Sequence, residues 1–184
     1  MAILIDQSAR VVVQGITGKE GARAAAEMLR SGTVVVAGVR PGKAGEIVHG
    51  VPVWDTVADA LRAEPGITAS LIAVPAPAVH AAALEAIAAR IPLIVILTEH
   101  VPTRATAEII AAARAAGVRI IGPSSVGILS TGQGKIGAIG SSEVADVFRP
   151  GSIGIISKSG GMTAEIAVAL GRGGFGVSTA VGMM

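Results

Sequence analysis

The chain has 184 residues, of which 51% are hydrophobic and only 2% aromatic, and its formal net charge is +2. This charge is too small to indicate nucleic acid or a membrane surface as a partner, and the lack of cysteine excludes disulfides and thiolate chemistry. The apolar stretches have the length of strands, and the first ten residues do not resemble a secretory signal, so we expect a cytoplasmic protein.

The first predicted unit, residues 11–43, consists of a strand, a glycine-rich turn, a helix and a second strand. Three valines at 11–13 favour a buried strand, and Gly15, Gly18 and Gly21 follow it. Glycines let a ligand approach the backbone, and the first turn of a helix offers unpaired N–H groups to phosphate. The unit therefore predicts a phosphate-binding turn. The alternative interpretation is a tight strand-to-helix turn without a ligand.

The end of the second predicted strand, Thr33–Gly38, indicates which phosphate ligand the turn would bind. Dinucleotide sites place Asp or Glu there to bind the ribose hydroxyls. Here the next residues are Val39-Arg40-Pro41-Gly42-Lys43, with two cations and no carboxylate. NAD is therefore disfavoured, and NADP or coenzyme A is favoured, because both carry an additional phosphate.

Strands and helices continue to alternate along the chain. We predict an extended piece at 50–54, a helix at 56–63 with Asp55 as its N-cap, a strand at 68–74, a helix at 77–90, a strand at 91–97, a helix at 103–116 and a strand at 118–121. This alternation predicts an α/β fold with a Rossmann-like, doubly wound parallel sheet. Because such sheets bind ligands at the carboxyl ends of their strands, the loops that begin at residues 15, 39, 74, 97 and 122 are expected to form one crevice.

The pattern is interrupted at residues 127–150, which are rich in glycine. We interpret this segment as a linker with a short strand near Lys135. Residues 1–126 then form the first domain, and 151–184 begin a second one with a strand at 152–156, a helix at 162–172 and a strand at 177–181. One βαβ unit is too small to form its own core. It therefore packs on the first domain or on a partner, or it belongs to a longer protein.

Two further groups of residues are candidates for ligand binding. Ser157, Lys158 and Ser159, with Gly160 and Gly161, form a second strand-to-helix turn that suits a phosphate or carboxylate. The alternative is an ordinary N-cap by Ser157 or Ser159. Glu99 follows a strand end, where it either binds a ligand or is a solvated carboxylate. The histidines lack metal-ligand spacing, so we expect no metal site.

At this point several segments resemble the α subunit of succinyl-CoA synthetase. They include VVVQGITGKEG, VRPGKAG, VPAP, LTEHVP, IIGPSSVGI and IISKSGG, and the resemblance covers essentially the whole chain. It implies a CoA-binding Rossmann-like domain followed by the first βαβ unit of a flavodoxin-like ligase domain. By position, it implies that CoA contacts Thr17, Gly18, Lys19, Glu20, Lys43, Pro75, Leu97, Thr98 and Glu99. Ser157, Ser159, Gly160 and Gly161 correspond to the phosphate and acid-substrate end of the site.

The resemblance also implies a reaction and a partner. The family is a ligase of the tricarboxylic acid cycle, which joins a carboxylic acid to CoA with ATP or GTP, through an acyl phosphate and a phosphohistidine. An ATP-grasp β subunit supplies the nucleotide and Mg²⁺ site, in an αβ or α2β2 assembly. The family's phosphohistidine motif, GHAGA, does not occur in these 184 residues, and His100 stands where the family has glycine. We expect this chain alone to bind CoA without turnover and to contain no catalytic residue.

The sequence departs from the family in two further segments. The family's PNC segment is Pro123-Ser124-Ser125 here, and SRSGTLTYE is SKSGGMTAE, with Ala164 in place of tyrosine. The second segment resembles ATP-citrate lyase and citryl-CoA synthetase, so succinate, malate and citrate all remain candidates. An alternative function is a non-enzymatic module that binds CoA or NADP. The sequence does not distinguish a natural short protein from a piece of a longer one.

Overall fold

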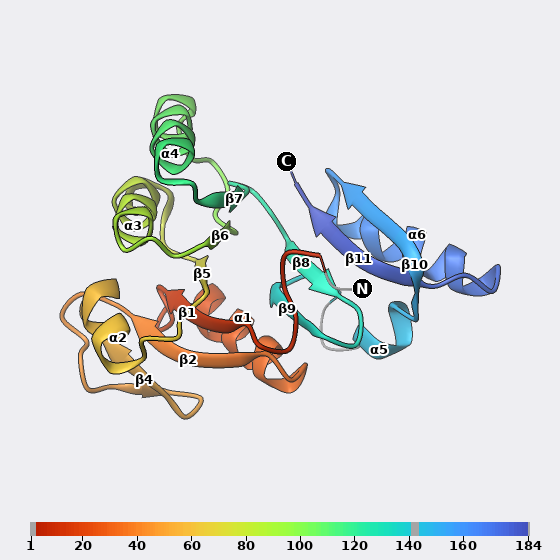
Figure 1. The fold of residues 1–184 in the computed structure, drawn as a ribbon, viewed down its shortest axis with the longest axis horizontal. Coiled ribbons are helices and arrows are strands. Elements are labelled where there is room, and N and C mark those ends of the chain that lie inside the picture. The colour runs from red at the N-terminus through yellow and green to blue at the C-terminus, as the bar shows by residue number, and fades with distance from the viewer. Residues whose placement is uncertain (1–2, 141–143, 184) are drawn as a thin grey trace.

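The computed structural model describes residues 3–140 and 144–183. A larger unit contains a seven-stranded sheet, and a smaller unit beside it contains a four-stranded sheet (Figure 1). The predicted α/β class with a Rossmann-like sheet and a further βαβ unit is confirmed. No helix among the described residues is both long and apolar enough to cross a membrane.

The larger unit alternates strands and helices, as predicted. Its elements are β1 (Arg10–Gln14), α1 (Lys19–Arg30), β2 (Val34–Val39), β3 (Ile47–Val48), β4 (Val51–Trp54), α2 (Val57–Ala63), β5 (Ala69–Ile72), α3 (Ala76–Ala88), β6 (Leu93–Ile96), α4 (Thr103–Ala116) and β7 (Arg119–Ile121). The strand order is β3-β4-β2-β1-β5-β6-β7. All neighbouring strands are parallel except β3 and β4, which form an antiparallel hairpin at one edge.

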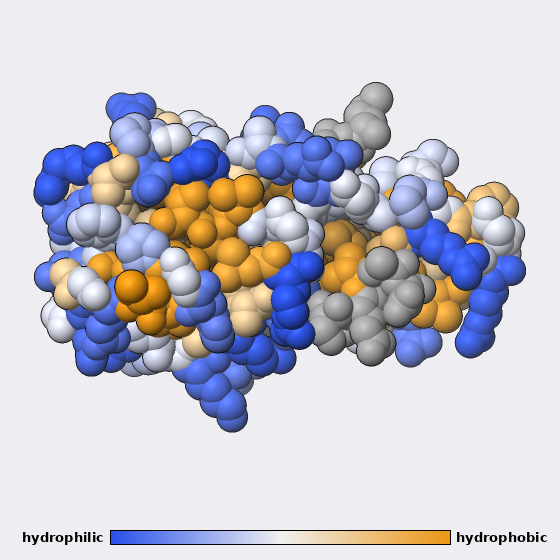
Figure 2. All heavy atoms as spheres, turned by 90° about the horizontal axis from the view of Figure 1, so that it is seen from below, coloured by the Kyte–Doolittle hydropathy of each residue, from blue (hydrophilic) through white to orange (hydrophobic). Residues whose placement is uncertain are grey.

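Both faces of this sheet are covered, which explains the continuous valine run in β1. Val11 and Val13 point into the core on the α1 side, whereas Val12 points into the core beneath α2, α3 and α4. All three side chains are fully buried. A strand buried on both faces needs apolar residues at every position. Figure 2 shows that hydrophobic side chains also gather on one outer face of the larger unit, bordered by hydrophilic ones.

The smaller unit contains β8 (Gly127–Ser130), β9 (Gly134–Gly137), α5 (Val144–Val147), β10 (Pro150–Ser157), α6 (Gly160–Arg172) and β11 (Val177–Gly182). Its strand order is β10-β11-β8-β9. The strands β10 and β11 are parallel and are connected by α6. These three elements form the predicted βαβ unit. The strand β8 pairs with β11 in antiparallel fashion, and β9 pairs with β8 in the same way at the edge of the sheet.

The segment 127–150 is more regular than we expected. The strand predicted near Lys135 is β9, but β8 was not anticipated, and the two form a hairpin. Glycine explains the difference, because a Cβ on Gly127 would lie 2.0 Å from the carbonyl oxygen of Ile136. The glycines therefore permit close contact between two strands. Residues 141–143 of this segment lie outside the described residues, and the domain boundaries themselves stay a prediction.

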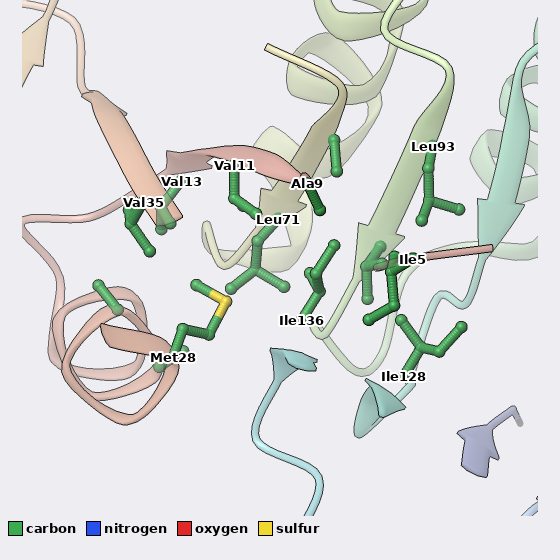
Figure 3. Close-up of a cluster of buried hydrophobic side chains, with 14 of the residues drawn as sticks. Ile5, Ala9, Val11, Val13, Met28, Val35, Leu71, Leu93, Ile128 and Ile136 are labelled. Atoms are coloured by element: carbon green, nitrogen blue, oxygen red, sulfur yellow. The ribbon is translucent and has the colours of Figure 1, made fainter. Parts of the chain in front are cut away.

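The β8–β9 hairpin also completes the core of the larger unit. Figure 3 shows Ile136 beside Leu71 and Ile128 beside Ile5, with Met28 of α1 approaching the same cluster. Ile128, Ile136, Leu71 and Met28 are all fully buried. The segment that we interpreted as a linker is thus part of the packed structure on the α1 face of the sheet.

The N-cap of α2 differs from our prediction. Thr56, rather than Asp55, is the cap, because its Oγ1 accepts a hydrogen bond from the N–H of Asp59 at 3.1 Å. The Asp55 carboxylate instead accepts hydrogen bonds from the backbone N–H groups of Lys43 and Ala44, at 3.0 and 3.1 Å. Asp55 therefore fixes the loop that follows β2.

Candidate functional site

A crevice of about 640 Å³ lies at the carboxyl ends of the parallel strands. Its volume is within the range of small-molecule sites in proteins. The loops after β1, β2, β5, β6 and β7 all contribute to its walls, so the predicted convergence of these loops is confirmed. The described lining residues are Gly15, Gly18, Lys19, Glu20, Arg23, Arg40, Ala73, Val74, Pro75, Leu97, Thr98, Glu99, His100, Ser125, Val126 and Ala138.

The glycine turn after β1 brings the backbone of α1 close to the sheet. Gly15 has a φ of +89°, and a Cβ there would lie 2.6 Å from the carbonyl oxygen of Ala73. A Cβ on Gly21 would lie 2.1 Å from the carbonyl oxygen of Gly15. Gly18 is the N-cap of α1 and offers no side-chain hydrogen bond. The first turn of α1 therefore presents backbone N–H groups, which suit a phosphate.

Charged side chains surround the crevice, and several are already paired. Arg23 contacts Glu20 at 2.8 Å and Glu27 at 3.9 Å, while Nε2 of His100 lies 3.9 Å from Oε2 of Glu99. Among the described lining residues, Lys19 and Arg40 have no ion pair. The crevice therefore keeps two cations available for an anionic ligand.

Most of the residues expected to contact CoA lie together in this crevice. They are Gly18, Lys19, Glu20, Pro75, Leu97, Thr98 and Glu99. The Oγ1 of Thr98 donates a hydrogen bond to the carbonyl oxygen of Val74 at 2.7 Å, which joins the loops after β5 and β6. The structure thus brings three predicted segments to one place, although their roles in binding stay predictions.

Two expected contact residues are not among the described lining residues. Thr17 belongs to the glycine turn but does not line the crevice. Lys43 lies in the loop after β2, and its Nζ forms an ion pair with Oε1 of Glu46 at 2.6 Å. Arg40 lines the crevice in the same loop.

The second glycine turn lies next to the crevice rather than in it. The Ser159 Oγ accepts a hydrogen bond from the N–H of Met162 at 3.3 Å, so Ser159 is the N-cap of α6. The Ser157 Oγ accepts from the N–H of Ser159 at 3.1 Å. A Cβ on Gly160 would lie 2.5 Å from Cγ1 of Val126, which lines the crevice, whereas Gly161 faces open space. Val126 therefore packs against this turn and also lines the crevice.

Sequence reasoning missed several lining residues. Arg23 follows Lys19 by four positions, and this spacing places both residues on one face of α1. The spacing could therefore have predicted that Arg23 lines the crevice. Ala138 belongs to the segment interpreted as a linker, and no sequence signal identified it. Residues 3–140 and 144–183 contain no cluster of three or more His, Cys, Asp or Glu residues that is arranged to hold a metal ion.

An open parallel sheet with a glycine-rich turn and a basic crevice at its carboxyl ends defines a Rossmann-like nucleotide-binding protein. Residues 6–100 match the family described as CoA binding domain, and the chain belongs to this family. The glycine turn, the first turn of α1 and the loops after β2, β5 and β6 all fall within the matched residues. The geometry fits such a ligand, since the glycines leave room and the cations suit its phosphates.

The chain is also similar over its whole length to α subunits of succinate–CoA ligases. It is 44% identical to subunit alpha 2 of the ADP-forming enzyme of Archaeoglobus fulgidus, covering 100% of the chain and 62% of the relative. Identity to the corresponding subunit of Methanothermobacter thermautotrophicus is 43%, covering 98% and 60%. The chain spans about three fifths of the length of these relatives. The resemblance inferred from the motifs is confirmed.

Solved structures confirm the fold. ATP citrate lyase from Methanothrix soehngenii, in complex with citrate and coenzyme A, superposes with a TM-score of 0.84 at 24% identity, over 98% of this chain and 32% of that one. A dinucleotide-forming acetyl-coenzyme A synthetase from Ca. Korarchaeum cryptofilum superposes with a TM-score of 0.77 at 22% identity, over 98% and 39%.

Proposed function

We propose that this chain is the CoA-binding α subunit, or part of it, of an acid–CoA ligase of the succinyl-CoA synthetase type. The enzyme would form an acyl-CoA from a di- or tricarboxylic acid with ATP or GTP. One observation carries the proposal. The crevice has a glycine turn on one side, and Arg40 rather than a carboxylate follows β2. The whole chain is also similar to such subunits. This arrangement favours CoA over NAD, because CoA carries an additional phosphate on its ribose.

The residues of the crevice would divide the binding of CoA among them. The backbone N–H groups at the start of α1, with Lys19, would hold the diphosphate. The loops that contain Pro75, Thr98 and Glu99 would hold the remainder of the ligand against the wall formed by Leu97. Bound CoA supplies the thiol that becomes the thioester.

The acid would bind near the start of α6, where Ser157, Ser159, Gly160 and Gly161 form the second turn. Gly161 has open space around it, which leaves room for a carboxylate beside the helix N-terminus. The relatives are named for succinate, and one structural neighbour holds citrate. Succinate, malate and citrate are all candidates for this chain.

The partner would be a β subunit of the ATP-grasp type that holds the nucleotide and Mg²⁺, in an αβ or α2β2 assembly. This proposal follows from the relatives, which are named as α subunits. The family's phosphohistidine motif is not within these residues. The chain on its own would therefore bind CoA without turning over.

Calorimetric titration of the chain with CoA and with NADP tests the proposal. We expect CoA to bind and NADP to bind at least 10-fold more weakly. The variant Gly15→Val provides the structural control, because its Cβ would clash with the carbonyl oxygen of Ala73 and distort the glycine turn. Tighter binding of NADP than of CoA would instead favour the alternative of an NADP-binding module. No binding of either ligand would refute both.

A further inference from the structure

Arg40 occupies the position of the crevice from which a Rossmann-like sheet contacts the ribose of its ligand. It follows β2 directly, where dinucleotide-binding proteins place the residue that recognises the ribose hydroxyls or a ribose phosphate. The N–H of Gly15 donates a hydrogen bond to the carbonyl oxygen of Val39 at 2.8 Å. This bond places Arg40 immediately beside the glycine turn.

The backbone of Arg40 is fixed while its side chain is available. Its N–H donates to the carbonyl oxygen of Trp54 at 2.9 Å, and its carbonyl oxygen accepts from the N–H of Lys43 at 3.1 Å. Asp55 anchors the same loop through Lys43 and Ala44. Arg40 lines the crevice, and its guanidinium has no hydrogen bond or ion pair within residues 3–140 and 144–183. Ligand binding would therefore have to order only the side chain.

The other cations near this position are less suited to the same task. Arg23 is held by Glu20 and Glu27. Lys19 begins α1 and lies beside the N–H groups that suit a diphosphate. Lys43 is paired with Glu46 and lies outside the described lining of the crevice. This leaves Arg40 as the cation closest to the expected place of the ribose.

We infer that the guanidinium of Arg40 binds the phosphomonoester on the ribose of the ligand, which is the 3′-phosphate in CoA. A planar guanidinium donates two parallel hydrogen bonds to one phosphate, a geometry that an ammonium group does not provide. Arg40 is thus a specificity-determining residue for the phosphorylated ribose. The inference rests on the proposed function, because it takes CoA as the ligand.

The test compares CoA with 3′-dephospho-CoA by calorimetry on the whole chain. For the unaltered protein we expect CoA to bind about 10-fold more tightly than 3′-dephospho-CoA, the scale of one charge-assisted contact. In Arg40→Ala this preference disappears, because the affinity for CoA falls while that for 3′-dephospho-CoA stays constant. Arg40→Lys keeps the charge without the planar group, so we expect it to retain only part of the preference.

The control is Arg114→Ala, which removes an exposed arginine at the C-terminal end of α4. This helix end lies at the opposite edge of the sheet, so the variant should keep the full preference. The same preference in Arg40→Ala as in the unaltered protein, or an equal loss of affinity for both ligands, would overturn the inference without contradicting the proposed function. If neither ligand bound the unaltered protein, the proposed function itself would fail. CoA carries its ribose phosphate at the 3′ position and NADP at the 2′ position. Titration of the unaltered protein with NADP therefore shows which of the two phosphates the site accepts.

Discussion

The Nζ of Lys135 lies 3.5 Å from Oε2 of Glu27, although 108 positions separate the two residues in the sequence. Lys135 is on β9 and is completely buried, and its Nζ also donates to the carbonyl oxygen of Ile139 at 3.1 Å. Glu27 is on α1, the helix whose first turn lines the crevice. The pair therefore connects the β8–β9 hairpin to the helix that presents the candidate ligand site.

Removal of one member of this pair should destabilise the fold strongly. We expect Lys135→Met to lower the free energy of unfolding by about 3–5 kcal/mol, because Glu27 is left nearly buried without its closest partner. In the double variant Glu27→Leu/Lys135→Met most of this loss should be recovered, since two apolar side chains replace two desolvated charges. Denaturant unfolding of both variants measures the difference. A double variant as unstable as the single one would contradict this account.

The same lysine predicts a pH dependence of stability. Burial lowers the pKa of Lys135 below its ordinary value of 10.5, more than the nearby Glu27 carboxylate raises it. Between the lowered and the ordinary pKa the unfolded chain binds more protons than the folded one. The free energy of unfolding should therefore rise with pH through this window. Unfolding measured from neutral pH to pH 10 should show a rise relative to Lys135→Met, and parallel curves would exclude a titrating Lys135.

Much of the larger unit could be predicted from the sequence, because its signals are local. The valine run of β1, the glycines after it and the alternation of strands with helices all depend on neighbouring residues. The helix at 103–116 was predicted with the bounds that the structure has, and Gly117 ends it with a φ of +70°. The convergence of the loops followed from the general geometry of parallel sheets.

The hairpin β8–β9 was not predicted, since its evidence is not local. Its glycines look like a flexible linker until Gly127 meets the backbone of Ile136. Ion pairing in the candidate site was equally invisible. Lys43 and Arg40 look equivalent in the sequence, but only the structure shows that Glu46 holds Lys43. The exchange of Asp55 for Thr56 as N-cap has the same origin, because Asp55 has partners in another loop.

Two helical glycines, one packed closely against the turn after β1 and one facing open space, should respond oppositely in stability to alanine. In Gly21→Ala the new Cβ would meet the carbonyl oxygen of Gly15, so α1 must shift, and we expect a loss of about 1–3 kcal/mol in stability. Gly161→Ala is the matched control, because this helical glycine faces open space and alanine favours the helix. Thermal unfolding should show a lower Tm for the first variant and an equal or higher Tm for the second. A drop in both would show that the turn geometry is not the cause.

Asp55 should influence ligand binding through the loop that contains Arg40. In Asp55→Ala the N–H groups of Lys43 and Ala44 lose their acceptor, so the loop would be less ordered in the free protein. Ordering the loop when CoA binds would then reduce the free energy of binding. We expect CoA affinity to fall about 5-fold, corresponding to roughly 1 kcal/mol. Asp55→Asn keeps a side-chain oxygen as acceptor and should bind nearly as well as the unaltered protein. Hydrogen exchange at the Lys43 and Ala44 amides gives a separate reading, and unchanged exchange in Asp55→Ala would remove Asp55 from this role.

Lys43 and Glu46 give a test of whether the lysine takes part in binding at all. If Lys43 leaves Glu46 to contact CoA, then Lys43→Ala should weaken binding by about 1–2 kcal/mol, as expected for a charged hydrogen bond. Glu46→Gln should have the opposite effect, because the ammonium group no longer has to break an exposed ion pair worth at most about 1 kcal/mol. Calorimetric titration of both variants with CoA distinguishes the cases. Equal affinity in Lys43→Ala and in the unaltered protein would show that the ion pair persists in the complex. Arg40 would then be the cation of this loop that contacts CoA.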